Sequence, residues 1–201
     1  RKNFEKFDSD KIIDNMMKSK NWVNSKYYGK TKEEIKEGWE INRIESSTAG
    51  TKLHHDIESF YNRCPTVQGS TCDIEYRYFI DFHFKSKHTV GLKPYRTEWM
   101  VYDEEYKIAG SIDMIFENKD GTLQIYDWKR CKEITKVNRW NKFSTNPIIE
   151  DIPDTNFWHY TLQLNTYKYI LEKNYGKTIS DMYLVVLHPN NDSYKRIRVP
   201  N

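Results

Sequence analysis

GSIDMIFENKDGTLQIYDWKR, residues 110–130, has the pattern of two β-strands joined by a tight turn. The turn falls at 118–121, where Asp-Gly between strand-like residues is a strong hairpin signal. A three-residue loop there would pair Asp113 directly with Asp127, whereas a two-residue loop would shift the pairing by one position. In either register two carboxylates meet on one patch, together with Lys129, which shares a strand face with Asp127.

The neighbours of these two acids predict burial. Ile112 and Met114 flank Asp113, and Tyr126 precedes Asp127, so both strands are expected to be covered on both faces. A buried carboxylate is costly unless it is paired or binds a metal ion. The two acids and the nearby lysine are therefore a candidate metal site; the alternative is a pair of solvent-facing acids with the lysine as a salt-bridge partner.

Carboxylate oxygens favour Mg²⁺ or Mn²⁺ over zinc. One or two such ions on Asp113 and Asp127 would leave positions for water and a substrate phosphate, and the carbonyl of Trp128 would be a further ligand. An ion of this kind lowers the pKa of its water and polarises phosphate. Lys129 would orient that water or stabilise developing negative charge.

Other acidic and helical residues are candidates for the same site. Glu98 lies in a predicted strand and would reach the ion directly or through water, or else be an ordinary strand carboxylate. Residues 51–61 predict a helix after a break at 46–50, and free N–H groups at its first residue, Thr51, would bind phosphate. His54 follows on this helix, where a histidine is more often structural than a ligand.

Gln163 and Tyr167 lie one turn apart on a helix predicted for 156–173. They are neutral hydrogen-bonding residues that would hold a lysine, a water or a phosphate, although ordinary polar helix positions explain them as well. A separate stripe that includes Tyr160 and Leu164 is expected to face the core.

The segment after the hairpin is basic and contains aromatic residues. Its positively charged residues include Arg130, Lys132, Lys136 and Arg139, and Trp140 lies beside them. Such a pattern suits a groove that follows a nucleic-acid backbone and stacks unpaired bases, and a solvated loop is the alternative. Because the net charge of the chain is only +3, any nucleic-acid contact must come from a local patch of this kind.

The order of elements predicts an α/β fold with a mixed central sheet flanked by helices. The predicted helices cover 8–24, 32–43, 51–61 and 156–173, and the strands cover 95–102, 108–116, 122–129, 182–187 and 194–199. Residues 73–86 alternate partly like a strand, but their apolar spacing favours a helix. The second helix should begin at a capping box formed by Thr31 and Glu34. A chain of 201 residues is expected to form one domain over 1–201, with a helical part at 1–48 and a functional core at 50–188.

The three cysteines, Cys64, Cys72 and Cys131, include no C-x-x-C pair, and this incomplete ligand set disfavours a zinc or iron–sulfur site. A Cys64–Cys72 disulfide stays open. Their odd number, without a visible secretory signal, suggests reduced thiols in an intracellular protein. No apolar run approaches the roughly 20 residues that a membrane helix needs, so a membrane partner is not expected.

Five segments together resemble the RecB-like branch of the PD-(D/E)XK nuclease superfamily. In order they are GTKLHHDIE (50–58), TEW (97–99), GSIDMIF (110–116), IYDWKR (125–130) and QLNTYKYIL (163–171). The D…DxK core is a weak signal alone, whereas five segments in this order and spacing are specific. Within that branch the pattern resembles phage-type exonucleases like that of lambda and CRISPR-associated RecB-like exonucleases.

This resemblance implies a restriction-endonuclease-like core and a Mg²⁺- or Mn²⁺-dependent DNA exonuclease that leaves 5′-phosphates. The implied metal ligands are His54, Asp113 and Asp127, and the implied catalytic residues are the lysine Lys129, with Glu98, Gln163 and Tyr167 in support. CRISPR-associated members often hold an iron–sulfur cluster on four cysteines. The chain has three, so no such cluster is expected.

Three alternatives stay open at this stage: a DNA endonuclease of the same fold, a non-catalytic DNA-binding module, and a glycoside hydrolase that uses the acid pair without metal. The intact D…DxK pattern disfavours the second, and Lys129 beside an acid disfavours the third. Expected partners are DNA, as duplex ends or single strands, a second copy of the chain, and a helicase or recombination protein. A composition rich in Asn, Lys and Ile suits an AT-rich genome, so we expect a giant-virus member in the cytoplasm or viral factory.

Overall fold

The computed structural model describes residues 3–64, 73–87 and 91–201, and Cys72 lies outside these ranges. The helices are α1 Ser9–Met17, α2 Lys32–Tyr61, α3 Ile74–Lys85 and α4 Asn156–Tyr175, with short 3₁₀ turns η1 Trp22–Asn24 and η4 Pro147–Ile149. The strands are β1 Lys93–Asp103, β2 Ile108–Glu117, β3 Leu123–Lys129, β4 Ile179–Val186 and β5 Lys195–Val199. The helix predicted for 8–24 is therefore shorter, because it ends at Met17.

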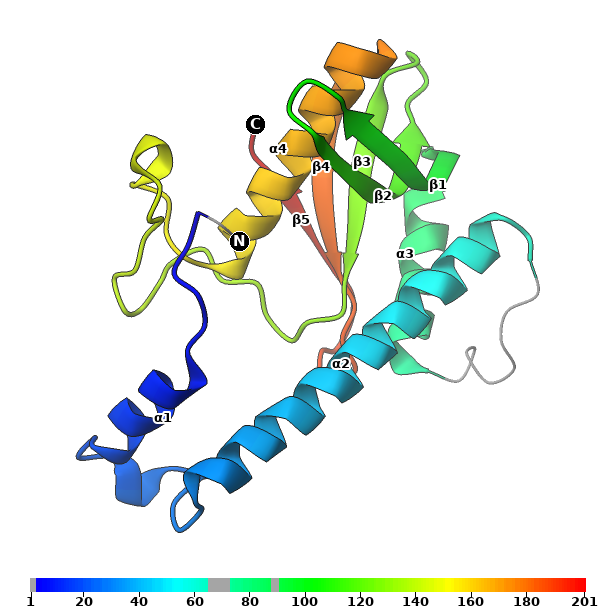
Figure 1. Ribbon diagram of the computed structural model, residues 1–201. Coiled ribbons are helices and arrows are strands. Elements are labelled where there is room, and N and C mark those ends of the chain that lie inside the picture. The colour runs from blue at the N-terminus through cyan, green and yellow to red at the C-terminus, as the bar shows by residue number, and fades with distance from the viewer. Residues whose placement is uncertain (1–2, 65–72, 88–90) are drawn as a thin grey trace.

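The five strands form one mixed sheet in the order β1-β2-β3-β4-β5. All neighbours are antiparallel except β3 and β4, which are parallel and are joined through α4. Parallel neighbours need a long crossover connection of this kind. Figure 1 shows α4 on one face of the sheet and α2 with α3 on the other. The predicted α/β class with a helix-flanked mixed sheet is confirmed.

Each face of the sheet carries its own apolar core. Ile125 packs toward α4, together with Leu164 and Phe157 of that helix. Tyr126 and Trp128 pack on the opposite face, in a cluster that also holds residues of α2 and α3. All of β3 except its last residue is buried, so its side chains alternate between two apolar layers rather than between core and solvent.

The hairpin adopts the three-residue loop. Met114 pairs with Tyr126 and Glu117 with Leu123, and the Asn118 N–H donates to the Thr122 carbonyl at 2.8 Å. Gly121 has a φ of +83°, a left-handed conformation that favours glycine. Continued one residue beyond its last pair, this register sets position 113 opposite position 127, as the turn chemistry predicts.

Helix α2 differs from the prediction, because it continues through 46–50 without a break. Its start is as predicted: the Glu34 N–H donates to Thr31 Oγ1 at 3.2 Å, and the Thr31 N–H donates to Glu34 Oε2 at 2.7 Å. Serine, threonine and glycine each lower helix propensity by only about 1 kcal/mol or less relative to alanine, too little to end a helix whose far end is anchored in the core.

The uninterrupted helix corrects the role expected for Thr51. This residue lies in the interior of α2, so its backbone N–H belongs to the helical hydrogen-bond ladder and cannot bind phosphate as a helix start would. Its side chain is exposed. Farther along, Leu53 and Ile57 are buried in the core that covers this face of the sheet.

Among the helices in the described ranges, none combines the length and the apolar character that crossing a bilayer would require.

A substitution at Gly50 tests the continuity of α2. Nothing lies within 4 Å of an added Cβ there, so Gly50→Ala should raise the free energy of unfolding by about 0.5–1 kcal/mol, as expected inside a helix. Urea denaturation measures this change. Gly121→Ala is the matched control and should lower stability, because Gly121 is left-handed. A destabilised Gly50→Ala protein would contradict a continuous helix.

Candidate active site

A row of three acids crosses the sheet where β1, β2 and β3 lie side by side. The pairs Thr97–Met114 and Trp99–Ile112 set Glu98 opposite position 113 on one side, and the hairpin register sets 127 opposite 113 on the other. Strand pairing brings directly opposite residues within about 5.5 Å. The sheet therefore places Glu98, Asp113 and Asp127 in one line.

Asp113, in the middle of the row, is held by the backbone of β3. Its Oδ2 accepts a hydrogen bond from the Trp128 N–H at 2.8 Å, and its side chain is 12% exposed. Burial raises the pKa of this carboxyl well above its usual range, and the charge of Asp127 raises it further. An additional positive charge at this place would relieve both effects.

His54 reaches the row from α2. Its Nδ1 lies 3.5 Å from Asp113 Oδ2 and 4.0 Å from Glu98 Oε1. One ligand atom from each of the three residues lies within 4.8 Å of the other two. Among the residues that the structure describes, these three form a group that could hold a metal ion.

The His54 ring makes a second hydrogen bond on the side away from the acids. That bond shows which ring nitrogen carries the proton and which faces the acids with its lone pair. Its Nε2 lies 3.0 Å from the Trp128 carbonyl, which can only accept, so Nε2 carries the proton and Nδ1 keeps its lone pair. Burial lowers the pKa of His54, although the attraction of Asp127 opposes the change. The lowered pKa favours the neutral form of the ring. A neutral imidazole with its second nitrogen so bonded is the usual arrangement of a metal ligand.

Trp128 thus contributes through its backbone while its side chain is buried in the core. Its N–H binds Asp113 and its carbonyl binds His54. The expectation that this carbonyl is itself a metal ligand stays a prediction, since a carbonyl oxygen has a second lone pair.

Glu98 occupies an unusual backbone conformation, with a φ of 41°. A left-handed non-glycine residue costs roughly 1–2 kcal/mol, and such strain is concentrated at functional sites. The Ser111 hydroxyl donates to Glu98 Oε2 at 2.7 Å, which fixes the carboxylate and leaves Oε1 toward His54. Sequence reasoning missed Ser111, although its spacing of two residues from Asp113 places both on one strand face.

Asp127 is paired differently from the other two acids. Its Oδ2 lies 2.6 Å from Lys129 Nζ, in a buried ion pair. Burial raises the pKa of Asp127, and Lys129 opposes the rise. The structure therefore groups Asp113 with His54 and Glu98, and pairs Asp127 with the lysine. A ligand role for Asp127 stays a prediction.

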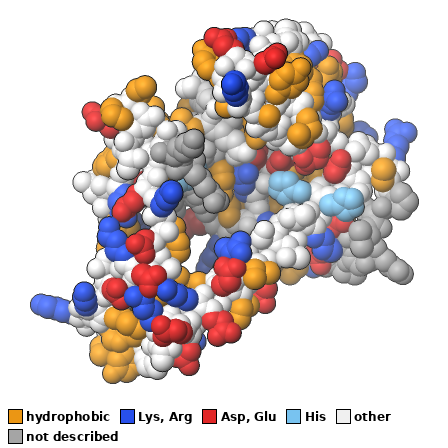
Figure 2. All heavy atoms as spheres, in the orientation of Figure 1, with side chains coloured by type: hydrophobic (Ala, Val, Ile, Leu, Met, Phe, Trp, Pro, Cys, Tyr) orange, Lys and Arg blue, Asp and Glu red, His pale blue; other side chains and the backbone are white. Residues whose placement is uncertain are grey.

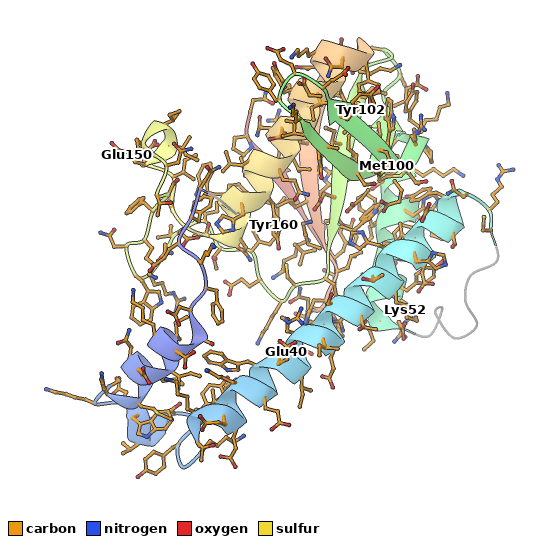
Figure 3. The ribbon with its side chains drawn as sticks, in the orientation of Figure 1. Glu40, Lys52, Met100, Tyr102, Glu150 and Tyr160 are labelled. Carbon is orange, nitrogen blue, oxygen red and sulfur yellow. The ribbon has the colours of Figure 1, made fainter. Side chains whose placement is uncertain are left out.

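Lys129 is held in place by α4. Burial alone would lower its pKa, yet the attraction of Asp127 and Asp113 outweighs burial and raises it, so the amine is charged. Its Nζ lies 4.4 Å from the centre of the Tyr160 ring, a cation–π contact. Figure 3 labels Tyr160 on α4. Tyr160 is half-buried and covers this lysine, whereas helical periodicity predicts it only as a core position.

Gln163 and Tyr167 bind each other, with Gln163 Nε2 donating to Tyr167 Oη at 2.9 Å. Tyr167 is 9% exposed and packs in the α4-side core, so its assignment to a stripe apart from Leu164 is wrong. A Cβ added to Gly110 would lie 2.6 Å from Tyr167 Cε1, so the ring rests against the strand that carries Asp113. Support of lysine or phosphate by this pair stays a prediction.

The basic segment is divided between paired and exposed side chains. Arg130 Nε lies 2.7 Å from Glu75 Oε1, and both side chains are largely buried, so this arginine is engaged within the protein. Lys136 Nζ lies 4.6 Å from the centre of the Phe157 ring. Trp140 is 84% exposed. The remaining predicted nucleic-acid contacts are the exposed residues Lys132 and Arg139.

Figure 2 shows the molecule hollowed between the sheet and the long helix α2, with acidic side chains and a histidine along the wall of the hollow. Of the predicted site residues, His54 of α2 and Glu98 of β1 are about one-third exposed, whereas Asp113 and Asp127 are largely buried.

Comparisons with known proteins are sparse. No family model matches the chain, and no curated protein matches it. Among solved structures it is similar to a candidate exonuclease from Eubacterium rectale, at 15% identity over 64% of this chain and 43% of that one, with a TM-score of 0.38. It is also similar to the protein SSO0001, at 17% identity over 75% and 66% of the two chains, with a TM-score of 0.30. The chain thus spans less than half the length of the first. Likeness at this level carries no functional conclusion, which rests instead on the site.

Gly110→Ala tests the contact between β2 and α4. The new methyl group would collide with Tyr167, so the variant should lose about 1–3 kcal/mol of stability, measured by urea denaturation. Tyr167→Leu shortens the opposing side chain and is the matched partner in a double-mutant cycle. The cost of Gly110→Ala should largely disappear in the Tyr167→Leu background. An equal cost in both backgrounds would contradict the contact.

Proposed function

We propose that this chain is a divalent-metal-dependent nuclease that hydrolyses the phosphodiester bonds of DNA, acting as an exonuclease. The observation that carries the proposal is the row of Glu98, Asp113 and Asp127 on neighbouring strands, with His54 at one side and Lys129 at the other. The RecB-like pattern of five sequence segments supports the choice of DNA and of exonuclease over other phosphodiester chemistry. Mg²⁺ or Mn²⁺ would be the cofactor, as one or two ions.

The donor atoms fit such an ion. Ligands at about 2.1 Å from a shared Mg²⁺ lie up to about 4.2 Å apart, and His54 Nδ1 lies 3.5 Å from Asp113 and 4.0 Å from Glu98. Two carboxylates and one imidazole favour Mg²⁺ or Mn²⁺ over a thiolate-preferring metal. The raised pKa of Asp113 also identifies a place where added positive charge is favourable.

In the proposed reaction a water oxygen bonds to phosphorus while the bond from phosphorus to the 3′ oxygen breaks. The attacking water gives up a proton as its O–H bond breaks, and the 3′ oxygen takes one up, so the products are a 5′-phosphate and a 3′-hydroxyl. A bound ion would polarise the phosphate and lower the pKa of water.

The residues of the chain supply position and charge for this reaction. Lys129 stays protonated beside Asp127, so its ammonium group stabilises negative charge that develops on the phosphate. Tyr160 restricts where that ammonium can move, because its ring covers the lysine. His54 stays neutral and holds its lone pair toward the acids, and Trp128 fixes the ring orientation.

The alternatives to this proposal differ in which bonds are cleaved, or in whether any bond is cleaved. An endonuclease of the same fold would use the same residues on internal bonds, and a DNA-binding module would bind without cleavage. A glycoside hydrolase is disfavoured, because Asp127 is ion-paired with Lys129 and is not free to act as an acid. DNA, a second copy of the chain, and a helicase or recombination protein are the proposed partners.

Asp113→Ala and Asp127→Ala should each abolish Mn²⁺-dependent cleavage of end-labelled DNA, a loss of at least about 10³-fold, because each removes a buried charge from the site. The cleavage assay is run with and without EDTA, and circular dichroism checks the fold. Glu117→Ala, on the same strand as Asp113 but paired with exposed Lys93, is the control and should cleave normally. Normal cleavage by Asp127→Ala would sink the proposal.

Lys129→Met separates the lysine from the metal ligands. It should lose cleavage by about 10²–10³-fold and still bind Mn²⁺, because the lysine stabilises charge rather than holding the ion. Asp113→Asn should lose Mn²⁺ binding itself. Titration calorimetry with Mn²⁺ measures binding, and thermal unfolding checks that each variant is folded. Full activity of Lys129→Met would contradict its role.

A further inference from the structure

Beyond the row of acids, β1 carries two apolar side chains that are largely uncovered. Met100 is 70% exposed and Tyr102 is 61% exposed, whereas Trp99 and Val101, which alternate with them, are buried in the α4-side core. Successive side chains of a strand point to opposite faces, so Met100 and Tyr102 lie on the face away from α4. Figure 3 labels both on β1.

Two small residues of β2 complete this surface. Met100 pairs with Ser111 and Tyr102 pairs with Ala109, and directly opposite residues of paired strands share a face. Ala109 is exposed and Ser111 is half-buried. Because alanine and serine are short, the thioether and the phenol ring stand above them. We call the surface formed by these four residues the β1–β2 shelf, and none of its side chains is charged.

The shelf begins where the row of acids ends. The Ser111 hydroxyl donates to Glu98 Oε2 at 2.7 Å, so Glu98 lies on the same face as the shelf. At about 3.4 Å per residue, Met100 lies about 7 Å and Tyr102 about 14 Å along the strand from Glu98. The first of these steps is comparable to the length of one nucleotide in an extended strand. The strand itself therefore determines how far the shelf lies from the acids.

The accessible side of the candidate active site faces the same way as the shelf. His54 and Glu98 are about one-third exposed, whereas Asp127 and Lys129 are largely buried. The open approach to the acids is therefore on the side of His54 and Glu98. Figure 2 shows hydrophobic side chains directly above the acidic side chains on the wall of the hollow. A substrate bound at the acids would extend over the shelf.

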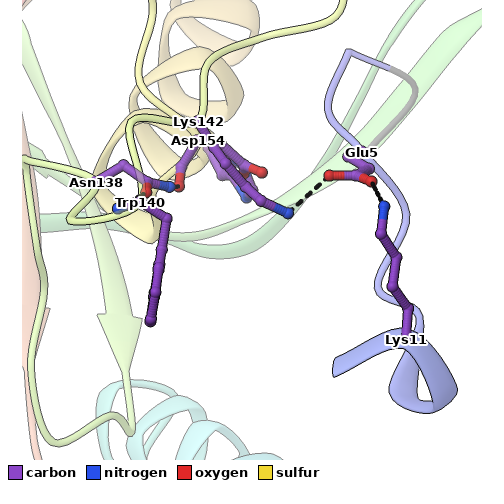
Figure 4. Close-up of polar contacts among 7 residues, drawn as sticks. Glu5, Lys11, Asn138, Trp140, Lys142 and Asp154 are labelled. Atoms are coloured by element: carbon purple, nitrogen blue, oxygen red, sulfur yellow. Dashed lines mark hydrogen bonds and ion pairs between the residues drawn. The ribbon is translucent and has the colours of Figure 1, made fainter. Parts of the chain in front are cut away.

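The exposed Trp140 belongs to a different surface. It lies in the loop between β3 and α4, which is attached to the residues before α1. The Asn3 carbonyl accepts from the Thr145 N–H at 2.8 Å. Lys142 Nζ lies 2.7 Å from Glu5 (Figure 4). Strand register does not determine how far this loop lies from the acids, as it does for the shelf.

We propose that the β1–β2 shelf binds the sugar and base of the nucleotide next to the cleaved bond, and that it selects deoxyribose over ribose. This inference rests on the proposed nuclease function and adds to it a nucleotide subsite and a reason for the choice of DNA. An uncharged surface beside three acids holds a phosphate poorly, so the sugar and base are the parts that fit. A 2′-hydroxyl placed against the Met100 thioether would lose water without gaining a strong hydrogen bond.

Kinetics of the double variant Met100→Ala/Tyr102→Ala test the subsite. With Mn²⁺ and an end-labelled DNA oligonucleotide, KM should rise about 10-fold with a smaller change in kcat, because the lost contacts hold substrate and transition state alike. Val23→Ala/Tyr28→Ala truncates an aliphatic residue and a tyrosine that are 60% and 58% exposed elsewhere, and it should keep the original KM. In the Lys129→Met background, fluorescence anisotropy should show oligonucleotide binding weakened by the same factor.

The outcomes separate this inference from the nuclease proposal. An unchanged KM in the Met100→Ala/Tyr102→Ala protein, or a fall in kcat alone, would overturn the subsite and leave the nuclease proposal standing. If the unsubstituted chain cleaves no DNA, the nuclease proposal fails and this inference fails with it. A shelf that instead contacts a second copy of the chain would change the elution volume in size-exclusion chromatography and leave KM unchanged, which would also overturn the subsite.

Single sugar substitutions test the selection of deoxyribose. A DNA oligonucleotide with one ribonucleotide beside the cleaved bond should be cut there about 10-fold more slowly than the all-DNA form. A 2′-fluoro nucleotide at that position is the control, because it favours the sugar pucker of ribose without adding a hydrogen-bond donor, and it should be cut at close to the DNA rate. Met100→Gln offers the 2′-hydroxyl an amide partner and should narrow the ratio between the two substrates. Equal rates on both substrates, or an unchanged ratio in Met100→Gln, would overturn the selection.

Discussion

Three carboxylates on adjacent strands repel one another, and the contacts around them reduce that repulsion. Glu98, Asp113 and Asp127 are set in line by the strand register, and burial raises the pKa of the last two. Each acid has a different partner that lowers the cost of its charge: the Ser111 hydroxyl, the Trp128 N–H and the Lys129 ammonium group. The neutral imidazole of His54 adds a nitrogen lone pair that could bind a metal ion, and it adds no charge. A site built in this way is stabilised by a cation.

The sheet makes this arrangement rigid because its central strand is covered on both faces. The side chain of Trp128 is buried in one core while its backbone N–H and carbonyl bind Asp113 and His54. One well-packed residue therefore joins two strands and a helix at the site. On the opposite face, the α4 core brings Tyr160 over Lys129, so both layers of the fold position the charged groups.

Sequence predicts the parts of this site that depend on local chemistry. The Asp-Gly turn determines the hairpin register, and the register aligns Asp113 with Asp127 across a short separation. The predicted break in α2 fails because a run of small residues weakens a helix only slightly, whereas core contacts at Leu53 and Ile57 secure it. The cover of Tyr160 over Lys129 and the contact of Asn3 with Thr145 depend on tertiary packing between distant segments, for which helical periodicity and loop composition give no signal.

The middle of α2 differs from its two ends in what stabilises it. Every residue from 41 to 48 is exposed, so this stretch has no tertiary packing and depends on its own backbone hydrogen bonds. Helical turns of this kind open at a lower free energy than turns packed in a core. The stretch 41–48 is therefore the part of α2 expected to open first, whereas the part that carries His54 is held on the sheet by Leu53 and Ile57.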